Sequence, residues 1–479
     1  MFEVHGKYTQ AKVFAENVET ECVSQIQAMT NAVQFTNPIA IMPDTHSGKG
    51  SVIGFTMPMS DKISPQVTGV DIGCGMLATN IGNTLPLSRD EIDAKIREQV
   101  PFGTNTHDAT SGINVEKEVP WKDINEEVDR LLKKVNPMFG WTQPTPVIDY
   151  DWFVKKCAEI GCKKGTAEKS FGSLGGGNHF CEFSRSTVTG DYWYTIHSGS
   201  RNFGKCVCDY WQDRARGIVN AKVSGAYEEV IRKIRETTPN KQDIPARIRE
   251  YRDSLGVQDM KTGLEYLEGN MAAAYLVDMV FAQAYANINR RVMSYIISRI
   301  LNVRAPKETI QSVHNFIDFD DLIIRKGAIR SYVGEKMIVP FNMVDGIIIC
   351  EGKSNPEWNF SAPHGAGRLM SRTAAMKNLD VGYYKQQIRE AGIYSSSVGT
   401  ATLDEAPKAY KRAEDIERLI EPTATIVDRL KPIIAMKDDG RNMREVMIER
   451  KKEKQAFKKD RREMARAKME EKERLARGE

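Results

Sequence analysis

Apolar and polar residues alternate over short stretches of this chain and recur at helical spacing over longer ones. The stretches ATNIG (78–82), YWYTIHS (192–198) and GIIICEG (346–352) are typical of strands. From about residue 206 to 300, apolar residues return every three or four positions, which predicts a helical insert. Because strand-like and helical stretches alternate, we predict an α+β (mixed α/β) fold with a β-sheet core and flanking helices.

The body of the chain has no Pro-, Gly- or Ser-rich linker and no internal repeat, so residues 1–440 are predicted to form one large domain. The tail, residues 441–479, has a different composition. It holds 15 Lys/Arg and 9 Asp/Glu, a net of +6, which leaves −2 for the rest of a chain whose total is +4. We predict a solvated extension that is helical or partly disordered, and a nucleic-acid-binding arm is the alternative.

The composition is that of a folded globular protein, with 41% hydrophobic and 28% charged residues. No apolar run approaches the ~18 residues of a membrane span, and the N-terminus lacks the pattern of a signal peptide, so we predict a cytoplasmic location. Eight cysteines in such a chain favour reduced thiols over disulfides. The cysteine pairs 157/162 and 206/208 lack a matching partner pair, so they are weak zinc candidates.

Most of the seven histidines stand in short segments of small, turn-forming residues. Small neighbours leave an imidazole accessible to a metal ion or a phosphate. The remaining two, His5 and His107, are predicted to be surface or structural residues. The five candidates are His46, His179, His197, His314 and His364.

The segment VTGVDIGCGM (67–76) presents Asp71 and Cys74 three residues apart among small and apolar neighbours. A carboxylate and a thiolate joined by imidazoles from elsewhere would suit Mn, Fe, Co or Zn. The alternative is an aspartate that caps a turn beside a small buried cysteine. The segment alone leaves both interpretations open.

The glycine-rich segment GSLGGGNHFCEF (172–183) matches neither the phosphate-loop nor the dinucleotide fingerprint. Its backbone would allow close approach of a ligand, and Asn178, His179 and Glu182 could contact a phosphate, a metal and a base edge. A tight structural turn is the alternative.

Cationic residues accompany the accessible histidines, since Arg201 follows His197, Arg368 follows His364, and Lys326 stands in RKGA. Guanidinium groups suit bidentate contact with phosphate, so we predict a polyanionic substrate.

The segment MKDDG (436–440) contains the K-x-D-G string of the ligases that use a lysine nucleophile. Those enzymes resemble one another in placing most of the nucleotide-binding domain after that lysine, whereas only the charged tail follows here. We therefore reject Lys437 as a nucleophile and keep it as a candidate nucleotide contact.

Several motifs together closely resemble the RtcB family of RNA-splicing ligases, over residues 1 to about 440. They are MPDTHSGKG, VDIGCG, GGGNHF.E, HSGSR, HN, RKGA, HGAGR.MSR, DEAP.AYK and the terminal MK. The resemblance implies a catalytic domain with a central metal cleft, dependent on GTP and on two Mn2+ ions. It also implies joining of an RNA 3'-phosphate or 2',3'-cyclic phosphate end to a 5'-hydroxyl end, in RNA splicing or repair.

The resemblance also assigns roles to individual residues of this chain. It implies that Asp71, Cys74 and His179 bind one Mn2+ and that Cys74, His197 and His314 bind the other. His364 would be the nucleophile that becomes guanylylated, and Arg201, Lys326 and Arg368 would bind RNA phosphates. The implied nucleotide contacts are Asn178, Glu182, His314, Asn315, Asn342, Met343, Gly365, Ala366, Gly367, Tyr410 and Lys437.

One segment departs from the family pattern. Where the family usually has PGSMG and a further serine, this chain has PFNMVDGI (340–347), so Phe341, Asn342 and Ile347 replace small or hydroxyl side chains. Guanine selectivity is therefore open. Two alternatives to the ligase stand beside it: a metal-dependent hydrolase of RNA terminal or cyclic phosphates, and a non-catalytic RNA-binding protein that acts through its tail.

Overall fold

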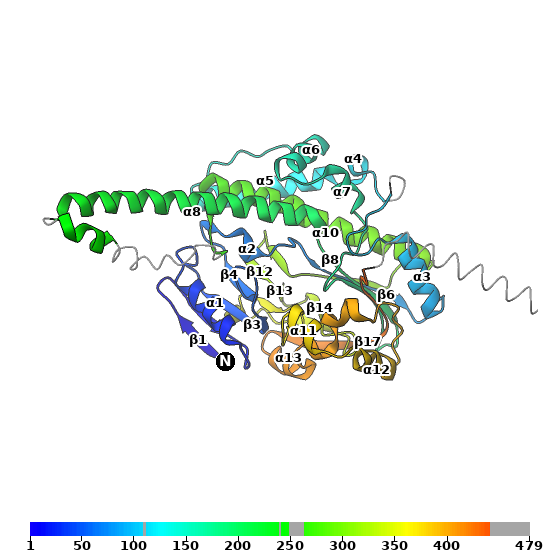
Figure 1. The fold of residues 1–479 in the computed structure, drawn as a ribbon. Coiled ribbons are helices and arrows are strands. Elements are labelled where there is room, and N and C mark those ends of the chain that lie inside the picture. Colours follow the sequence, from blue (N-terminus) through cyan, green and yellow to red (C-terminus); the bar gives the residue numbers. More distant parts are fainter. Residues whose placement is uncertain (109–111, 239–240, 249–262, 441–479) are drawn as a thin grey trace, which may run out of the picture.

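A seven-stranded antiparallel sheet lies at the centre of the computed structural model, which describes residues 1–108, 112–238, 241–248 and 263–440 (Figure 1). The first and last strands of its order, β10 and β14, meet where the Ile338 backbone N–H donates to Ser312 Oγ at 2.9 Å. The sheet therefore curves into a near-barrel. In sheet order its strands are β10 (Glu308–Val313), β6 (Gly75–Gly82), β8 (Tyr192–Ser198), β7 (Phe180–Ser186), β17 (Ala424–Met436), β15 (Ile347–Gly352) and β14 (Lys336–Pro340).

A six-stranded sheet lies beside the near-barrel, and only its β2–β3 pair is parallel among the described strands. Its order is β1 (Phe2–His5), β2 (Gln10–Val13), β3 (Ile39–His46), β4 (Ile53–Pro58), β12 (Ile323–Lys326) and β11 (Asn315–Ile317). Two short pairs complete the strands: β13 (Ala328–Arg330) with β16 (Ser361–Pro363), and β5 (Lys62–Ile63) with β9 (Leu267–Glu268).

Side chains on the strands of the near-barrel alternate between two environments, as the period of two in a strand requires. On β6, Leu77 joins the apolar core against α3 and α10, whereas Met76 and Ala78 face the inside. On β8, Trp193 faces the inside, and so therefore does His197, four residues further along the same strand. The inner face thus carries polar side chains that could perform chemistry.

Two long helices, α8 (Arg201–Thr237) and α10 (Gly269–Ile300), pack together with α5 (Trp121–Phe139) on one side of the sheets, and the far half of α8 extends away from the body (Figure 1). Rings such as Phe203, Phe281 and Tyr285 fill the core between these helices. On the other side lie α11 (Arg372–Asn378), α12 (Val381–Glu390) and α13 (Ala413–Leu419).

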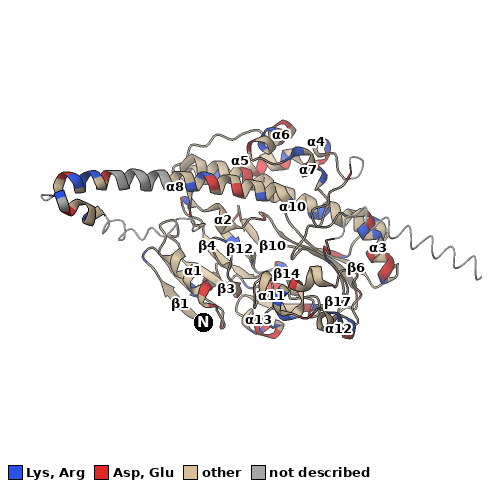
Figure 2. Ribbon diagram, viewed as in Figure 1, with Lys and Arg blue, Asp and Glu red and all other residues tan. Residues whose placement is uncertain are grey.

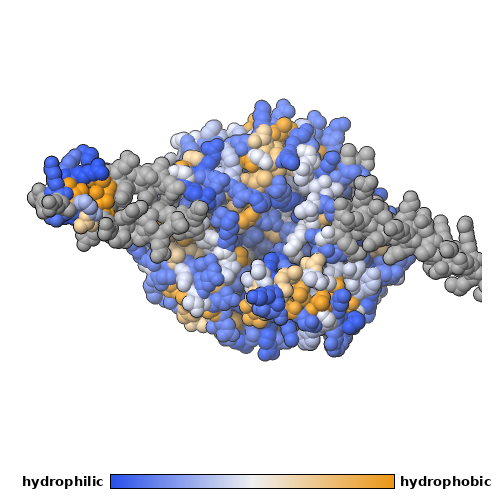
Figure 3. All heavy atoms as spheres, viewed as in Figure 1, coloured by the Kyte–Doolittle hydropathy of each residue, from blue (hydrophilic) through white to orange (hydrophobic). Residues whose placement is uncertain are grey.

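The remaining helical segments are short, apart from α1 and α3. They are α1 (Thr20–Thr30), α2 (Pro65–Thr68), α3 (Arg89–Gln99), α4 (Val115–Glu118), α6 (Tyr150–Glu159), α7 (Lys164–Lys169) and the 3-10 turns η1 (Lys241–Asp243), η2 (Pro356–Trp358), η3 (Thr400–Glu405) and η4 (Pro407–Ala409). On the face drawn in Figure 3, hydrophilic residues predominate and apolar patches are scattered, as on an ordinary globular surface.

The strand predictions at 78–82, 192–198 and 346–352 are confirmed by β6, β8 and β15. The mixed α+β class is likewise confirmed. The predicted helical region corresponds to α8 and α10, although α8 already begins at Arg201 and the short β9 precedes α10. The predicted tail, residues 441–479, lies outside the described residues. Within the described residues no helix has the length and apolar character to cross a membrane.

Candidate metal centre and adjoining cavity

The five side chains predicted as metal ligands meet at one end of the near-barrel, where four neighbouring strands begin or finish. Strands β10, β6, β8 and β7 are neighbours in the sheet and run antiparallel. The end of one therefore lies beside the start of the next. His314 follows β10, Cys74 precedes β6, His197 is on β8 and His179 precedes β7, while Asp71 lies in the turn before Cys74.

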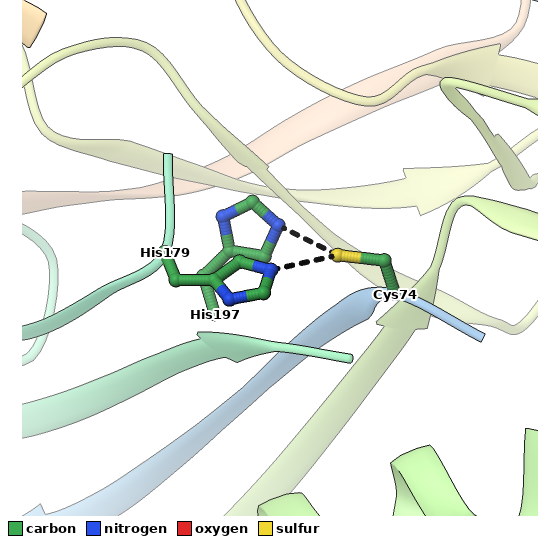
Figure 4. Close-up of side chains that lie close together, drawn as sticks. All are labelled: Cys74, His179 and His197. Atoms are coloured by element: carbon green, nitrogen blue, oxygen red, sulfur yellow. Dashed lines mark hydrogen bonds between the residues drawn. The ribbon is translucent and has the colours of Figure 1, made fainter. Parts of the chain in front are cut away.

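The candidate ligand atoms form a continuous group around the Cys74 thiol, in which Asp71 is partly exposed and the other side chains are buried. Figure 4 shows Cys74 with His179 and His197. Cys74 Sγ lies 3.4 Å from His179 Nε2 and 3.3 Å from His197 Nε2. His179 Nε2 is in turn 3.0 Å from Asp71 Oδ2, and His197 Nε2 is 3.3 Å from His314 Nε2. Cys74 therefore joins two sets of ligand atoms, one with Asp71 and His179 and the other with His197 and His314.

The chemistry of these atoms fits divalent metal ions. His197 Nδ1 lies 3.2 Å from the Asn178 carbonyl, so a neutral ring donates there and turns the lone pair of Nε2 to the cluster. Burial lowers the pKa of His197 and of His314 well below the usual value, so both rings are neutral at pH 7. Burial and the charge of Asp71 raise the pKa of the Cys74 thiol, so a cation is needed to stabilise its thiolate.

Neighbouring residues hold the aspartate and the cysteine loop in place. Ser200 donates to Asp71 Oδ1 through its backbone N–H at 2.9 Å and its hydroxyl at 3.2 Å. Only glycine fits at position 199, because a Cβ there would lie within 2.4 Å of the Asp71 carboxylate. The buried Arg290 donates to the carbonyls of Gly73 and Ser198, both at 2.8 Å, and so joins the cysteine loop to the end of β8.

A cavity of about 470 Å³ adjoins the cluster, and His364 and His197 are among the residues that line it. The ring centres of His364 and His314 are 4.9 Å apart, so the predicted nucleophile lies directly beside the predicted ligands. Most of the predicted nucleotide contacts line this cavity: Asn178, Glu182, Asn342, Met343, Gly365, Ala366, Gly367, Tyr410 and Lys437.

Asp44 fixes the orientation of His364. Its Oδ2 lies 2.6 Å from His364 Nδ1 and accepts the backbone N–H groups of His364 and Gly365, each at 3.2 Å. The nearby carboxylate favours a proton on Nδ1, which leaves the lone pair of the His364 ring on Nε2. His46, from the same strand as Asp44, also lines the cavity, and burial lowers its pKa to about 4, so it is neutral at pH 7.

One wall of the cavity is cationic and is organised around the buried Glu405. Glu405 accepts from Lys437 Nζ at 2.9 Å, Tyr410 Oη at 2.6 Å, Arg372 Nη1 at 2.6 Å and Arg368 Nη1 at 3.3 Å. Burial alone would raise the pKa of Glu405, but the charges of Lys437 and Arg372 and the hydroxyl of Tyr410 lower it to about 2. Arg372 Nη1 also donates to Asp404 Oδ2 at 2.5 Å. Three cations thus face two carboxylates, which leaves this wall with a net positive charge.

Glu182 is a second buried acidic group that lines the cavity. Its carboxyl accepts from Ser184 Oγ at 2.7 Å, and burial raises its pKa to about 8. Glu182 is therefore largely protonated at pH 7 in the absence of a ligand. Phe180 lies near it on β7, with Lys437 Nζ 5.5 Å from the ring centre.

Three predicted contacts have partners elsewhere in the protein. Lys326 is buried, and its Nζ donates to the carbonyls of Lys49, Ser51 and Gln66 at 2.6 to 3.1 Å, so its N–H groups are engaged. Asn315 accepts from the Gly327 N–H at 3.0 Å. Neither residue lines the cavity.

Arg201 also has internal partners, since Nε donates to Ser173 Oγ at 3.0 Å and Nη2 to the Gly103 carbonyl at 2.5 Å. In the segment 340–347, which departs from the family pattern, Phe341 and Asn342 line the cavity, whereas Ile347 belongs to the apolar core inside the near-barrel. Of the two remaining histidines, His5 is exposed, and His107 is buried against the Gly172 carbonyl.

Sequence reasoning did not assign roles to Asp44, Arg372, Glu405 or Arg290. The first three stand inside the quoted motifs MPDTHSGKG, HGAGR.MSR and DEAP.AYK, so their motif membership was an available signal. Arg290 stands within a helical apolar pattern, where nothing in the sequence distinguishes it from the neighbouring Arg291.

Comparison with known proteins connects this site to a family. The sequence profile described as "tRNA-splicing ligase RtcB" matches residues 25–438. RNA-splicing ligase RtcB of Escherichia coli K12 is 28% identical over 447 residues, which cover 89% of this chain and 97% of that protein. The tRNA-splicing ligases RtcB of Nanoarchaeum equitans and Archaeoglobus fulgidus are 23% and 25% identical, over 90% and 82% of this chain and 94% and 86% of those proteins.

The fold and the site first indicate a class: mixed α+β proteins with a buried Cys/His cluster that could hold a metal ion beside a cationic cavity. The family match then makes the assignment specific. This chain belongs to the RtcB family and is an RNA ligase of that type. The resemblance stated from the motifs is confirmed.

Proposed function

We propose that this protein joins an RNA end bearing a 3'-phosphate or 2',3'-cyclic phosphate to a 5'-hydroxyl end, with consumption of GTP and with two Mn2+ ions per site. The observation that carries the proposal is the position of His364. Asp44 holds its Nδ1, and its ring lies 4.9 Å from His314 of the Cys/His cluster. A nucleophile and a phosphate-activating centre are thus side by side.

The metal ions would be held by the two sets of atoms that share Cys74. Asp71 and His179 would complete one set, and His197 and His314 the other. When bound, the ions would supply Lewis acidity at the phosphates and neutralise charge that develops on them. A carboxylate, a thiolate and three imidazoles form a donor set that suits manganese as well as zinc, iron or cobalt.

His364 would act as a nucleophile toward the α-phosphate of GTP. Because Nδ1 lies 2.6 Å from the Asp44 carboxylate, the ring proton is favoured on Nδ1, which leaves the lone pair on Nε2. The Nε2–P bond forms as the bond to pyrophosphate breaks, and the ring becomes positive. The negative charge of Asp44 stabilises that positive ring.

The cavity supplies the contacts that hold the nucleotide. Glu182 and Asn178 would bind the guanine edge and a phosphate, and the backbone at 365–367 would pass along the ribose. Lys437 and Tyr410, both bonded to Glu405, would close over the base. Asn342 and Met343 would contact the nucleotide from the opposite wall.

Cationic side chains would then receive the RNA. Arg368 and Arg372 line the cavity and would contact the 3'-phosphate. Arg201 would contribute through Nη1, since its Nε and Nη2 donate to Ser173 and Gly103. The RNA 3'-phosphate takes the guanylyl group from His364, and the 5'-hydroxyl then attacks this activated phosphate and releases GMP. A cyclic phosphate must first be hydrolysed to the 3'-phosphate. Lys326 is left out of this proposal because its N–H groups are engaged within the protein.

End-labelled RNA tests the proposal against the hydrolase alternative. A ligase joins a labelled 3'-phosphate strand to a 5'-hydroxyl strand only when GTP and Mn2+ are present, and it fails when the acceptor carries a 5'-phosphate. Conversion of the cyclic end to a phosphate without joined product, whether or not GTP is added, would instead support the hydrolase.

A further inference from the structure

A second cavity, of about 720 Å³, lies on the outer face of the near-barrel sheet. It is formed by the C-terminal half of α10, the following loop at 301–307, and strands β6 and β10. Figure 2 shows Lys or Arg segments on α10 toward the end that lies beside α3. We call this cavity the arginine groove, and it is defined by Asn287, Arg291, Tyr295, Arg299, Arg304 and Gln311.

Among the described residues, no carboxylate neutralises the positive charge of the arginine groove. Three of its lining residues are arginines and none is Asp or Glu. In the part of the chain that the structure describes, no ion pair joins Arg291, Arg299 or Arg304 to a carboxylate. The acids nearest in sequence are otherwise engaged, since Asp278 pairs with Lys156 and Glu308 with Lys336. An uncompensated cluster of guanidinium groups attracts a polyanion.

An exposed aromatic ring stands between two of these arginines. Tyr295 is 64% exposed and lies one helical turn from both Arg291 and Arg299, since residues four apart share a helix face. The Arg299 guanidinium lies 5.7 Å from the centre of the Tyr295 ring. An exposed aromatic ring flanked by arginines suits an unpaired base that stacks on the ring while its phosphates contact the cations.

The strands that form the groove also lead to the candidate metal centre. Leu77 and Gln311 line the groove and are each three residues from a predicted ligand, Cys74 and His314. At ~3.3 Å per residue, this separation is ~10 Å along the strands. Met76, adjacent to Leu77, lines the nucleotide cavity, so the groove and that cavity occupy opposite faces of the same strands.

From this placement we propose that the arginine groove binds a single-stranded segment of the RNA substrate, away from the end that reacts. This proposal rests on the proposed function, because it takes the polyanion to be the RNA that the enzyme joins. Amide side chains such as Asn287 and Gln311 add hydrogen-bonding groups of the kind that contact sugar and phosphate. Short RNA would occupy the reactive cavity alone, whereas longer RNA would reach the groove.

The test uses the full-length protein and a fluorescent 3'-phosphate RNA of ~16 nucleotides, a length that spans a typical single-strand site. The double variant Arg291→Glu/Arg299→Glu is compared with Lys155→Glu/Lys163→Glu, which makes the same change of net charge at exposed lysines on α6 and before α7. Fluorescence anisotropy gives Kd over a range of salt concentrations, and thermal unfolding checks that each variant is folded.

We expect the groove variant to weaken binding at least ~10-fold and to reduce the slope of log Kd against log salt by about 1.4, which is ~0.7 for each of two lost phosphate contacts. Tyr295→Ala should weaken binding by about 10-fold, as loss of one stacked base does, with the slope retained. A dinucleotide 3'-phosphate should bind all these proteins equally.

Unchanged Kd and salt slope in the groove variant, or an equal loss of affinity in the lysine control, would contradict RNA binding by the arginine groove. Formation of the GMP adduct on wild-type protein, measured without RNA, tests the proposed function separately. If no adduct forms but RNA binding still depends on the groove, the ligase mechanism is contradicted and the proposal for the arginine groove is retained.

Discussion

Asp44→Asn is expected to slow guanylylation of His364 by roughly 100-fold. The change keeps the size of the side chain, and the amide oxygen can still accept the backbone N–H groups of His364 and Gly365, so the fold should persist. What is lost is the negative charge 2.6 Å from His364 Nδ1. Two full unit charges at that distance, with an effective dielectric constant of ~20, attract by about 6 kcal/mol.

This attraction energy is an upper limit, because the charge on each group is spread over several atoms. If about half of it acts in the transition state, the barrier rises by ~3 kcal/mol, which corresponds to roughly 100-fold in rate. The assay is the single-turnover rate at which α-labelled GTP modifies the protein, with Asp61→Asn at the surface as the control. A rate within about threefold of wild type, in a folded variant that binds Mn2+ normally, would refute the electrostatic role of Asp44.

Three further predictions concern metal, nucleotide and stability. Cys74→Ala should lower bound manganese from two ions to one or none per chain, measured by metal analysis after dialysis, while Cys206→Ala should keep both. Binding of GTP at pH 7 should release about one proton, because Glu182, with its pKa raised to about 8, must ionise to accept guanine N–H groups. Calorimetry in two buffers of different ionisation enthalpy should measure this proton release. The Glu182→Gln variant should release no proton when it binds GTP. Glu405→Gln should lower the free energy of unfolding by ~3 kcal/mol at pH 7, given a folded pKa of about 2 against 4.5. The Glu405 carboxylate stabilises the fold above its unfolded pKa and loses this effect as the pH falls through its folded pKa. More than half of the difference in unfolding free energy between wild type and variant should therefore be gone by about pH 3. A difference in unfolding free energy that does not depend on pH would contradict the assignment.

The strands could be predicted because their apolar residues follow the period of two that a sheet imposes. Positions 192–198 illustrate this, since Tyr194 and Ile196 face the outer core while Trp193 and His197 face the inside. The closure of the sheet into a near-barrel could not be predicted in this way. It depends on contacts such as Ile338 with Ser312, which lie 26 residues apart and leave no local pattern.

The candidate site was predictable as a set of residues but not as a geometry. Glycine-rich surroundings singled out the histidines, and the resemblance to the RtcB family assigned their roles. Glu405 was missed because its importance arises from four partners that converge from separate segments. Lys326 was predicted to bind RNA phosphate, and its ammonium is enclosed by backbone carbonyls, an environment that no local sequence pattern indicates.

The central claim is that His364 becomes covalently guanylylated, and intact-mass spectrometry tests it most directly. Wild-type protein incubated with GTP and Mn2+ should gain the mass of one guanylyl group, and peptide mapping should place it on His364. His364→Ala should gain nothing, while His5→Ala at the surface should behave as wild type. An adduct that persists in His364→Ala, or that maps to Lys437, would contradict the account.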